Sequence, residues 1–111
     1  MKKTVSLKLN REFKSLYYRG GSNVSSHLVI YFKKNKRGEN RLGITVSKKI
    51  GNAVTRNRVR RRISELYRAR EDMIRDGFDI VIVARTRAAE ALFSQLGASL
   101  DFLLSKSGLL K

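Results

Sequence analysis

The feature that most constrains the fold is a run of four β-branched residues, Ile80, Val81, Ile82 and Val83, inside residues 78–85. Successive side chains of a strand point to opposite faces of its sheet. A strand that is apolar at every position is therefore expected to be buried on both faces. The rest of the chain must supply the neighbouring strands and the helices that cover them.

The segments before this strand have alternating helical and extended patterns. The apolar residues Leu9, Phe13, Leu16 and Tyr17 fall on one helical stripe, and Gly20 is expected to end that helix as a C′ residue. The next segments are predicted to be a turn with an extended stretch at 20–26, a strand at 28–32, a loop at 33–40 and a strand at 41–50.

The strand at 41–50 has two different faces. Leu42, Ile44 and Val46 point one way. The alternate positions are small or polar, namely Gly43, Thr45 and Ser47. This second face either meets water or leaves room for a ligand.

Two amphipathic helices are predicted in the second half of the chain. Asn52 can cap the first one, which ends near residues 76–77. Its apolar side consists of Val59, Ile63, Leu66, Tyr67, Met73 and Ile74. The last helix spans about 88–105, and its core stripe is Leu92, Leu96, Leu100, Leu103 and Leu104.

These elements predict an α+β fold in a single domain, residues 1–111. The architecture is a two-layer α/β sandwich with an about four-stranded sheet, a long Arg-rich helix and two further helices. A helix that joins two parallel strands normally crosses over in the right-handed sense. Because the chain has no long apolar segment and no cysteine, we expect an intracellular protein without a membrane span.

The positive charge is concentrated in the first 62 residues, which hold 18 Lys and Arg against only Glu12 and Glu39. The remaining residues hold seven basic and seven acidic side chains, so the formal net charge of +16 belongs to the first part. A field of this strength indicates a polyanionic partner. The domain is expected to present one strongly positive face.

Protein-borne catalysis has little support in the sequence. His27 is the only histidine, and cysteine is absent. The acidic residues Glu65, Asp72, Asp76 and Asp79 are interpreted as ion-pair partners of nearby arginines rather than as an acid–base pair. No catalytic residue, metal ligand or protein-bound cofactor is predicted.

Residues 43–63 carry the most specific signal. Lys48 and Lys49 precede a helix N-terminus, where backbone N–H groups already favour phosphate. The first turns of that helix then carry five arginines, Arg56, Arg58, Arg60, Arg61 and Arg62. Guanidinium groups bind phosphate in a bidentate manner, so this cluster is best explained by an RNA or DNA backbone.

The same segment closely resembles the arginine-rich signature of the bacterial ribonuclease P protein subunit. The resemblance covers Lys48–Val54, then Arg56, Asn57, Arg58 and the turn through Arg62, and it continues in the first helix, the strand around Tyr31 and the final strand and helix. It implies a cytoplasmic subunit without its own active site. That subunit assembles with a catalytic RNA, which holds Mg²⁺ and removes the 5′ leader of precursor tRNA; no protein partner is evident.

The resemblance also implies a left-handed, ribosomal-protein-like crossover and two sets of binding residues. Contacts to the catalytic RNA would be Lys48, Asn52, Arg56, Arg58, Arg60 and Arg62. Contacts to the leader, in a cleft between the long helix and the sheet, would be Phe13, Tyr17, Tyr31, Thr45, Lys49, Asn57 and Arg61. Ser64 departs from a position that is often basic in the family, so a leader contact there is in doubt.

Two alternatives remain open at this stage. Phe13 and Tyr17 can be ordinary core residues on an apolar helix stripe. The chain can also be a structural ribosomal or other RNA-binding protein without a processing role. The aromatic cleft separates the two functions, because unpaired RNA bases stack on aromatic side chains.

Overall fold

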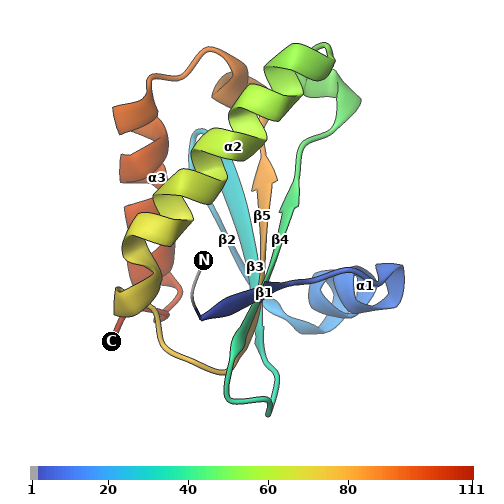
Figure 1. Ribbon diagram of the computed structural model, residues 1–111, viewed down its shortest axis with the longest axis vertical. Helices are drawn as coiled ribbons and strands as arrows, with labels where there is room; N and C mark the ends of the chain where they lie inside the picture. Colours follow the sequence, from blue (N-terminus) through green and yellow to red (C-terminus); the bar gives the residue numbers. More distant parts are fainter. Residues whose placement is uncertain (1–2) are drawn as a thin grey trace.

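The computed structural model describes residues 3–111, which form a five-stranded mixed sheet with three α-helices (Figure 1). The strands are β1 (Thr4–Ser6), β2 (Gly21–Val24), β3 (Leu28–Lys34), β4 (Asn40–Thr45) and β5 (Phe78–Ala84). The helices are α1 (Asn10–Arg19), α2 (Ala53–Arg70) and α3 (Phe93–Lys106), with short 3₁₀ helices η1 (Lys48–Ile50), η2 (Glu71–Met73) and η3 (Thr86–Ala89). The predicted α+β class is confirmed.

The strand order is β1-β4-β5-β3-β2, with β5 at the centre. β4 pairs in parallel with both β1 and β5, whereas β3 pairs antiparallel with β5 and β2. The sheet thus has five strands where the sequence predicts about four. The additional edge strand is β1, whose three residues are too few and too polar to give a periodic signal.

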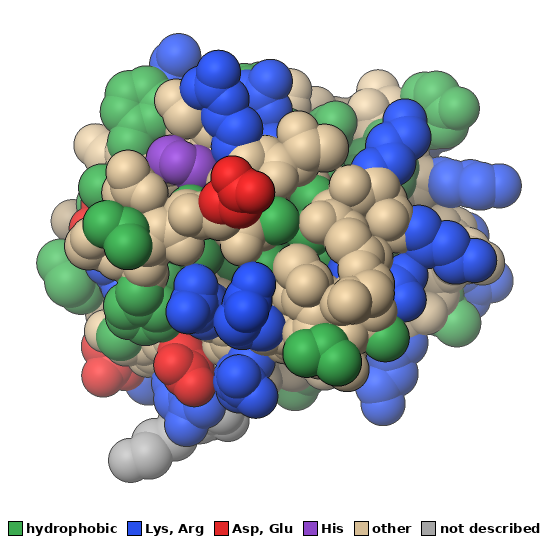
Figure 2. Space-filling model, turned by 90° about the horizontal axis from the view of Figure 1, so that it is seen from above, with side chains coloured by type: hydrophobic (Ala, Val, Ile, Leu, Met, Phe, Trp, Pro, Cys, Tyr) green, Lys and Arg blue, Asp and Glu red, His purple; other side chains and the backbone are tan. Residues whose placement is uncertain are grey.

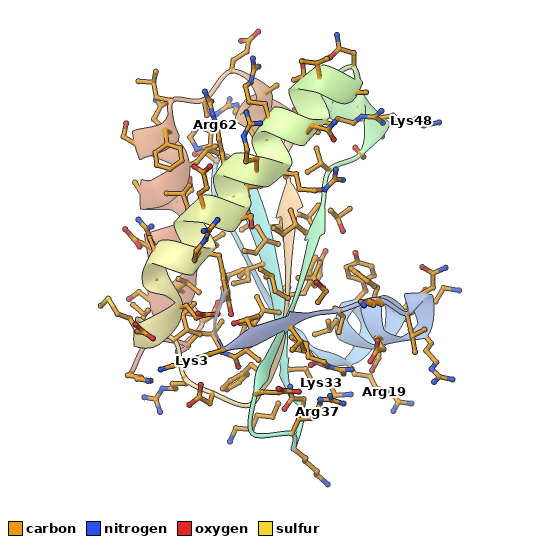
Figure 3. All side chains as sticks on the ribbon, viewed as in Figure 1. Lys3, Arg19, Lys33, Arg37, Lys48 and Arg62 are labelled. Carbon is orange, nitrogen blue, oxygen red and sulfur yellow. The ribbon has the colours of Figure 1, made fainter. Side chains whose placement is uncertain are left out.

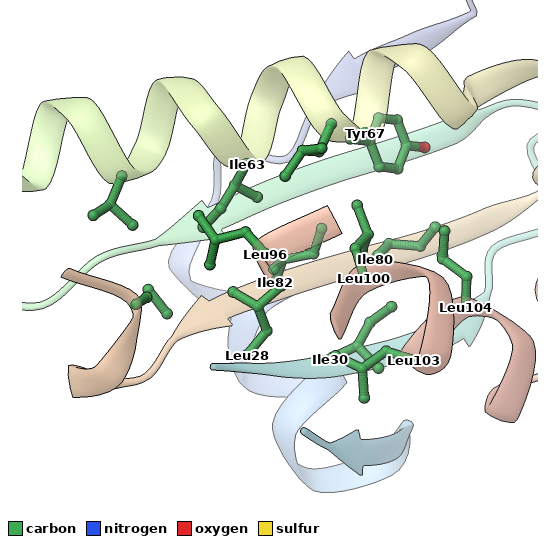
Figure 4. Close-up of a cluster of buried hydrophobic side chains, with 14 of the residues drawn as sticks. Leu28, Ile30, Ile63, Tyr67, Ile80, Ile82, Leu96, Leu100, Leu103 and Leu104 are labelled. Atoms are coloured by element: carbon green, nitrogen blue, oxygen red, sulfur yellow. The ribbon is translucent and has the colours of Figure 1, made fainter. Parts of the chain in front are cut away.

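Helices α2 and α3 cover one face of the sheet and enclose the main core (Figure 4). The sheet contributes Leu28, Ile30, Ile80 and Ile82, all of them fully buried. The helices contribute Ile63, Tyr67, Leu96, Leu100, Leu103 and Leu104. Burial of this apolar surface is the main force that holds the two helices on the sheet.

Helix α1 packs on the opposite face of the sheet. Leu16 and Leu7 are buried there against Val81, with Tyr31 and Phe13 partly buried beside them. The four-residue apolar run of β5 is therefore covered on both faces, as predicted. The two-layer prediction describes α2, α3 and the sheet, and α1 adds partial cover to the second face.

The connection β4-α2-β5 is left-handed. In Figure 1 both strands run upward, α2 descends in front of the sheet, and β5 lies to the left of β4. This arrangement departs from the general preference for right-handed crossovers. It matches the handedness that the family resemblance implies.

Several predicted boundaries differ from the structure. The strand predicted at 41–50 ends at Thr45, and residues 48–50 form η1 instead. Gly20 has an extended backbone rather than a left-handed one, because the chain passes directly from α1 into β2. The last helix begins at Phe93 rather than near residue 88, since residues 86–89 form η3.

These boundaries explain two exposed residues that were expected in the core. Met73 follows the end of α2 and is 60% exposed, and Leu92 is the N-cap of α3 and is 66% exposed. The predicted cap of α2 is confirmed. The Asn52 side-chain oxygen accepts a hydrogen bond from the Thr55 backbone N–H at 2.9 Å.

Candidate RNA interface

A groove runs along α1 and consists of two hollows that meet at Phe13; we call it the α1 groove. One hollow is lined by Asn10, Phe13, Lys14, Tyr17 and Thr45. The other is lined by Thr4, Val5, Ser6, Leu7, Phe13, Leu42, Gly43, Ile44, Arg60 and Ser64. The groove thus joins α1, the edge of the sheet and one side of α2.

The floor of the groove depends on a glycine. The Phe13 ring lies so close to Gly43 that a Cβ atom at that position would be 2.6 Å from the ring carbons Cε1 and Cζ. Gly43 lets the ring lie flat on β4, and the half-buried Thr45 follows it on the same face of the strand. The small, polar face predicted for this strand therefore accommodates an aromatic ring of α1.

Tyr17, which lines the groove, packs against Tyr31 of β3. The Tyr17 and Tyr31 rings are 4.8 Å apart between centroids, with their planes at 75°. Tyr17 is 40% exposed, whereas Tyr31 is half-buried between α1 and the sheet. A face of the Tyr17 side chain is thus accessible, while Tyr31 supports it from below.

A charged cluster fixes α1 to the sheet. Arg41 donates to Asp79 from Nε at 2.7 Å and from Nη2 at 2.6 Å, and its Nη1 donates to Glu12 of α1. Arg41 and Asp79 are register partners on β4 and β5. Asn35 donates a further bond to Asp79 at 2.9 Å.

The charges in this cluster stabilise one another. Burial alone would raise the pKa of Asp79, but hydrogen bonds from Arg41 and Asn35 outweigh it and hold the pKa below its ordinary value. Burial likewise opposes ionisation of Glu12, and the Leu9 backbone N–H and Arg41 together lower its pKa. The hydrogen bonds to Asp79 raise the pKa of Arg41 despite partial burial. All three groups are therefore charged at neutral pH.

The side of α2 that faces the groove carries four polar residues at helical spacing: Asn57, Arg60, Arg61 and Ser64. Arg60 and Ser64 line the second hollow, and Arg60 Nη1 reaches Asn57 Oδ1 at 3.5 Å. Asn57 and Arg61 are exposed and lie outside both hollows. This side of α2, which we call the groove face, therefore places two arginines and an amide beside the aromatic residues of the α1 groove.

The opposite side of α2 carries Arg58 and Arg62, which we call the η3 face. Arg58 Nη2 and Arg62 Nη1 are each 3.4 Å from a backbone carbonyl oxygen, of Ala89 and Ala91 respectively. Both side chains are half-buried. In Figure 3, Arg62 lies toward α3, whereas Lys48 lies at the far end of η1.

The residues before and at the start of α2 form its basic N-terminal end. Lys48 and Lys49 are exposed on η1, and Asn52 caps the helix. Arg56 is half-buried one turn later. Figure 2 views this end of the molecule and shows Lys and Arg side chains (blue) widely spread over it, with few Asp and Glu (red) among them.

The structure thus brings together Phe13, Tyr17, Tyr31 and Thr45 of the predicted leader set. Lys49 of η1 and Asn57 and Arg61 of α2 do not line either hollow of the groove. Among the residues predicted for the catalytic RNA, Arg60 lies on the groove side and Arg58 and Arg62 lie on the other. Sequence reasoning missed Asn10 and Lys14 as lining residues, although both share the helical face of Phe13 and Tyr17.

Residues 3–111 also bear on two other functions, metal binding and membrane insertion. No three His, Cys, Asp or Glu side chains of this range lie close enough together to hold a metal ion. Within the same range, no helix has the length and apolar character needed to cross a membrane.

The chain as a whole has relatives among known proteins. A family model described as Ribonuclease P matches residues 1–108. The ribonuclease P protein component of Clostridioides difficile (strain 630) is 42% identical over 106 residues, which cover 95% of this chain and 93% of that relative. The corresponding protein of Thermoanaerobacter sp. (strain X514) is 44% identical over 108 residues, or 97% and 93% of the two chains.

Solved structures agree with these relatives. The RNase P protein of Staphylococcus aureus superposes with a TM-score of 0.88 at 34% identity, covering 96% of this chain and 97% of that one. The RNase P protein of Thermotoga maritima gives a TM-score of 0.83 at 33% identity, covering 91% of this chain and 96% of that one.

Proposed function

Because this chain belongs to the ribonuclease P protein family, we propose that its α1 groove binds the 5′ leader of precursor tRNA. The chain is a protein subunit of a ribonucleoprotein endoribonuclease that acts in tRNA processing, and its partner is the RNA of that enzyme. Catalysis resides in the RNA. The relatives named above offer no support for a structural ribosomal role.

The observation that carries the leader proposal is the meeting of aromatic and basic side chains at the groove. Phe13 and Tyr17 of α1 lie next to Thr45 of β4, and Arg60 of α2 lines the adjoining hollow. Single-stranded RNA is bound by aromatic planes for its bases and by cations along its backbone. A groove with both, open along its length, fits one unpaired strand better than a duplex.

The catalytic RNA is proposed to contact the N-terminal end and the η3 face of α2. Lys48, Arg56, Arg58 and Arg62 are the cations in question, and Asn52 lies among them at the helix cap. The unpaired N–H groups of the first turn add a partial positive charge. Separate surfaces for the two RNAs allow one small protein to bind both at once.

The magnesium ions of the reaction are proposed to bind the RNA, in the position where they activate water. The protein would act on this chemistry only by holding the substrate. We expect the assembly to work in the cytoplasm, because a chain without cysteine needs no oxidising compartment.

Thr45→Leu tests the leader proposal. The larger side chain should obstruct the groove beside Phe13, whereas Thr45→Val keeps the size, removes only the hydroxyl group and so serves as the control for size. In the holoenzyme, Thr45→Leu should weaken binding of a leader-bearing precursor about ten-fold and leave mature tRNA almost unaffected. Equal losses for precursor and mature tRNA would contradict the assignment of the groove to the leader.

A further inference from the structure

Another hollow, separate from the α1 groove, has basic and aromatic walls. It lies on the far side of η3 from α2. We call it the η3 pocket. Its walls come from the end of β2 and the turn to β3, the segment after β5 and one side of α3. The side chains that matter are His27, Arg85, Arg87, Gln95, Ser99 and Phe102. None of the described residues that line it is acidic.

The polar groups of the pocket are held in place by the fold. His27 Nδ1 lies 2.9 Å from Ser99 Oγ, and this bond orients the half-buried ring between β3 and α3. Arg85 Nη1 donates to the Ser25 carbonyl oxygen at 2.7 Å, which leaves the rest of its guanidinium group for a ligand. The exposed Arg87 side chain has no hydrogen bond or ion pair with any described residue.

Phe102 supplies an accessible aromatic plane at the same pocket. The side chain is 50% exposed, whereas the four leucines of the same helix are buried in the core. Lys106 Nζ lies over the ring, 5.5 Å from its centre, so a cation already stands against one face and a stacking base would use the other. An exposed ring beside arginines is the arrangement on which unpaired bases stack.

The pocket continues the basic surface of α2. Arg58 and Arg62 reach the carbonyl oxygens of Ala89, the last residue of the η3 helix that carries Arg87, and of Ala91, two residues later. An RNA strand that leaves the η3 face of α2 and crosses this segment therefore meets Arg87 next. The hollow between α2 and α3, by contrast, is lined by Glu65 of α2 and by Asp101 and Phe93 of α3.

We propose that the η3 pocket binds one unpaired nucleotide of the catalytic RNA, with its phosphate on Arg85 and Arg87 and its base on Phe102. The proposal rests on the proposed contact between α2 and that RNA. It adds a third RNA contact, on the far side of η3. The charge and the aromatic plane favour RNA over a protein segment as the occupant.

Two variants test the proposal, each with a matched control. Phe102→Ala removes the stacking plane, and Phe93→Ala removes a ring of the same helix that is 43% exposed outside the pocket. Arg87→Ala removes one cation, and Arg19→Ala removes an exposed one at the end of α1, away from α2 and α3 (Figure 3). None of these changes touches the core, so all four proteins are expected to fold.

The measurement is equilibrium binding of each protein to the catalytic RNA over a range of salt concentrations, followed by precursor binding to the holoenzyme. Phe102→Ala should weaken catalytic-RNA binding about 5- to 100-fold. Arg87→Ala should lower the salt slope by about 0.7 to 0.9. Phe93→Ala should keep the wild-type affinity, and Arg19→Ala the wild-type slope.

Three outcomes would overturn the proposal. One is that Phe102→Ala and Phe93→Ala bind the catalytic RNA equally well. Another is that the loss falls on precursor tRNA in the holoenzyme and not on the catalytic RNA. The third is that Arg87→Ala keeps the wild-type salt slope. Failure of the leader proposal would appear only in the comparison of precursor with mature tRNA, so the two results are distinguishable.

Discussion

Tyr17 of α1 and Tyr31 of β3 meet edge to face, so that a helix on one side of the sheet presents an aromatic ring supported by a strand. The pair contributes about 0.5–1.5 kcal/mol beyond its buried area. Its members differ in exposure, because Tyr17 is accessible and Tyr31 is half-buried. We therefore expect Tyr17 to contact RNA and Tyr31 to hold the Tyr17 ring in place.

Tyr17→Ala should therefore act mainly on RNA binding. We expect affinity of the holoenzyme for precursor tRNA to fall by about 1–3 kcal/mol, because a base loses its stacking partner. Tyr17→Phe keeps the ring and should bind normally. Tyr31→Ala should lower both precursor affinity and the free energy of unfolding, and urea titrations of the free proteins distinguish the two effects.

Gly43→Ala should disturb the floor of the groove. The added Cβ would meet the Phe13 ring at 2.6 Å, and the ring cannot bend as a flexible chain end can. We expect a loss of about 1–3 kcal/mol in the free energy of unfolding, together with weaker precursor binding. In a double-mutant cycle, Phe13→Leu should recover part of the stability of Gly43→Ala. Additive effects of the two changes would show that the ring and the glycine are not coupled.

Arg58→Ala and Arg61→Ala should differ in stability although both remove one arginine from α2. Arg58 donates to the Ala89 carbonyl oxygen, and its Nε atom is buried, whereas Arg61 is exposed. Arg58→Ala should lower the free energy of unfolding by about 1 kcal/mol, and Arg61→Ala should change it by no more than about 0.5 kcal/mol. Thermal or urea unfolding of the free proteins measures this. Identical stabilities would mean that the contact with the η3 segment does not contribute to folding.

The Arg41–Asp79 pair should make the protein less stable in acid. The pKa of Asp79 is lower in the folded chain than its ordinary value near 4. Its stabilising effect is therefore complete above about pH 4 and is lost as the pH falls through the folded pKa. Glu12 acts in the same direction, since its pKa is lowered as well.

Asp79→Asn should accordingly be less stable than the wild type at pH 7 and show a smaller further loss at pH 3. Asp101→Asn removes a carboxylate that is 59% exposed in its ion pair with Arg70, and this control should follow the wild-type decline. Urea unfolding at the two pH values gives the comparison. An undiminished acid loss in Asp79→Asn would assign the effect to other groups.

Much of the fold was predictable because local signals agree with the tertiary structure. Three local patterns each allow one structural interpretation: the apolar run of β5, the Asn52 cap and the Leu96 to Leu104 stripe. β1 was missed because its stability comes from pairing with β4, some 36 residues away, rather than from its own sequence. The start of α3 was placed too early, because the propensity of residues 88–92 for helix does not distinguish η3 from an α-helix.

The sequence predicts many of the residues of the candidate site, but only partly how they are arranged in space. The sequence indicates Phe13, Tyr17, Tyr31 and Thr45 together. Phe13, Tyr17 and Thr45 line one hollow of the groove, and Tyr31 contacts Tyr17. Helical spacing shows which residues of α2 share a face, but not which other element lies beside that face. That Arg60 lines the groove could therefore be seen only in the structure. Asp79 was predicted as an ion-pair partner of an arginine, and that is confirmed; that its partner is Arg41 depends on strand register.

The bonds from Arg41 to Glu12 and Asp79 have a consequence for how the protein meets a flexible RNA. They hold α1 on the sheet before any ligand arrives, so one wall of the groove needs no rearrangement on binding. The loss of conformational entropy then falls mostly on the leader, which gives up its own freedom to follow a fixed surface. A receptor of this kind selects its strand by shape and stacking, and it can accept leaders of many different sequences.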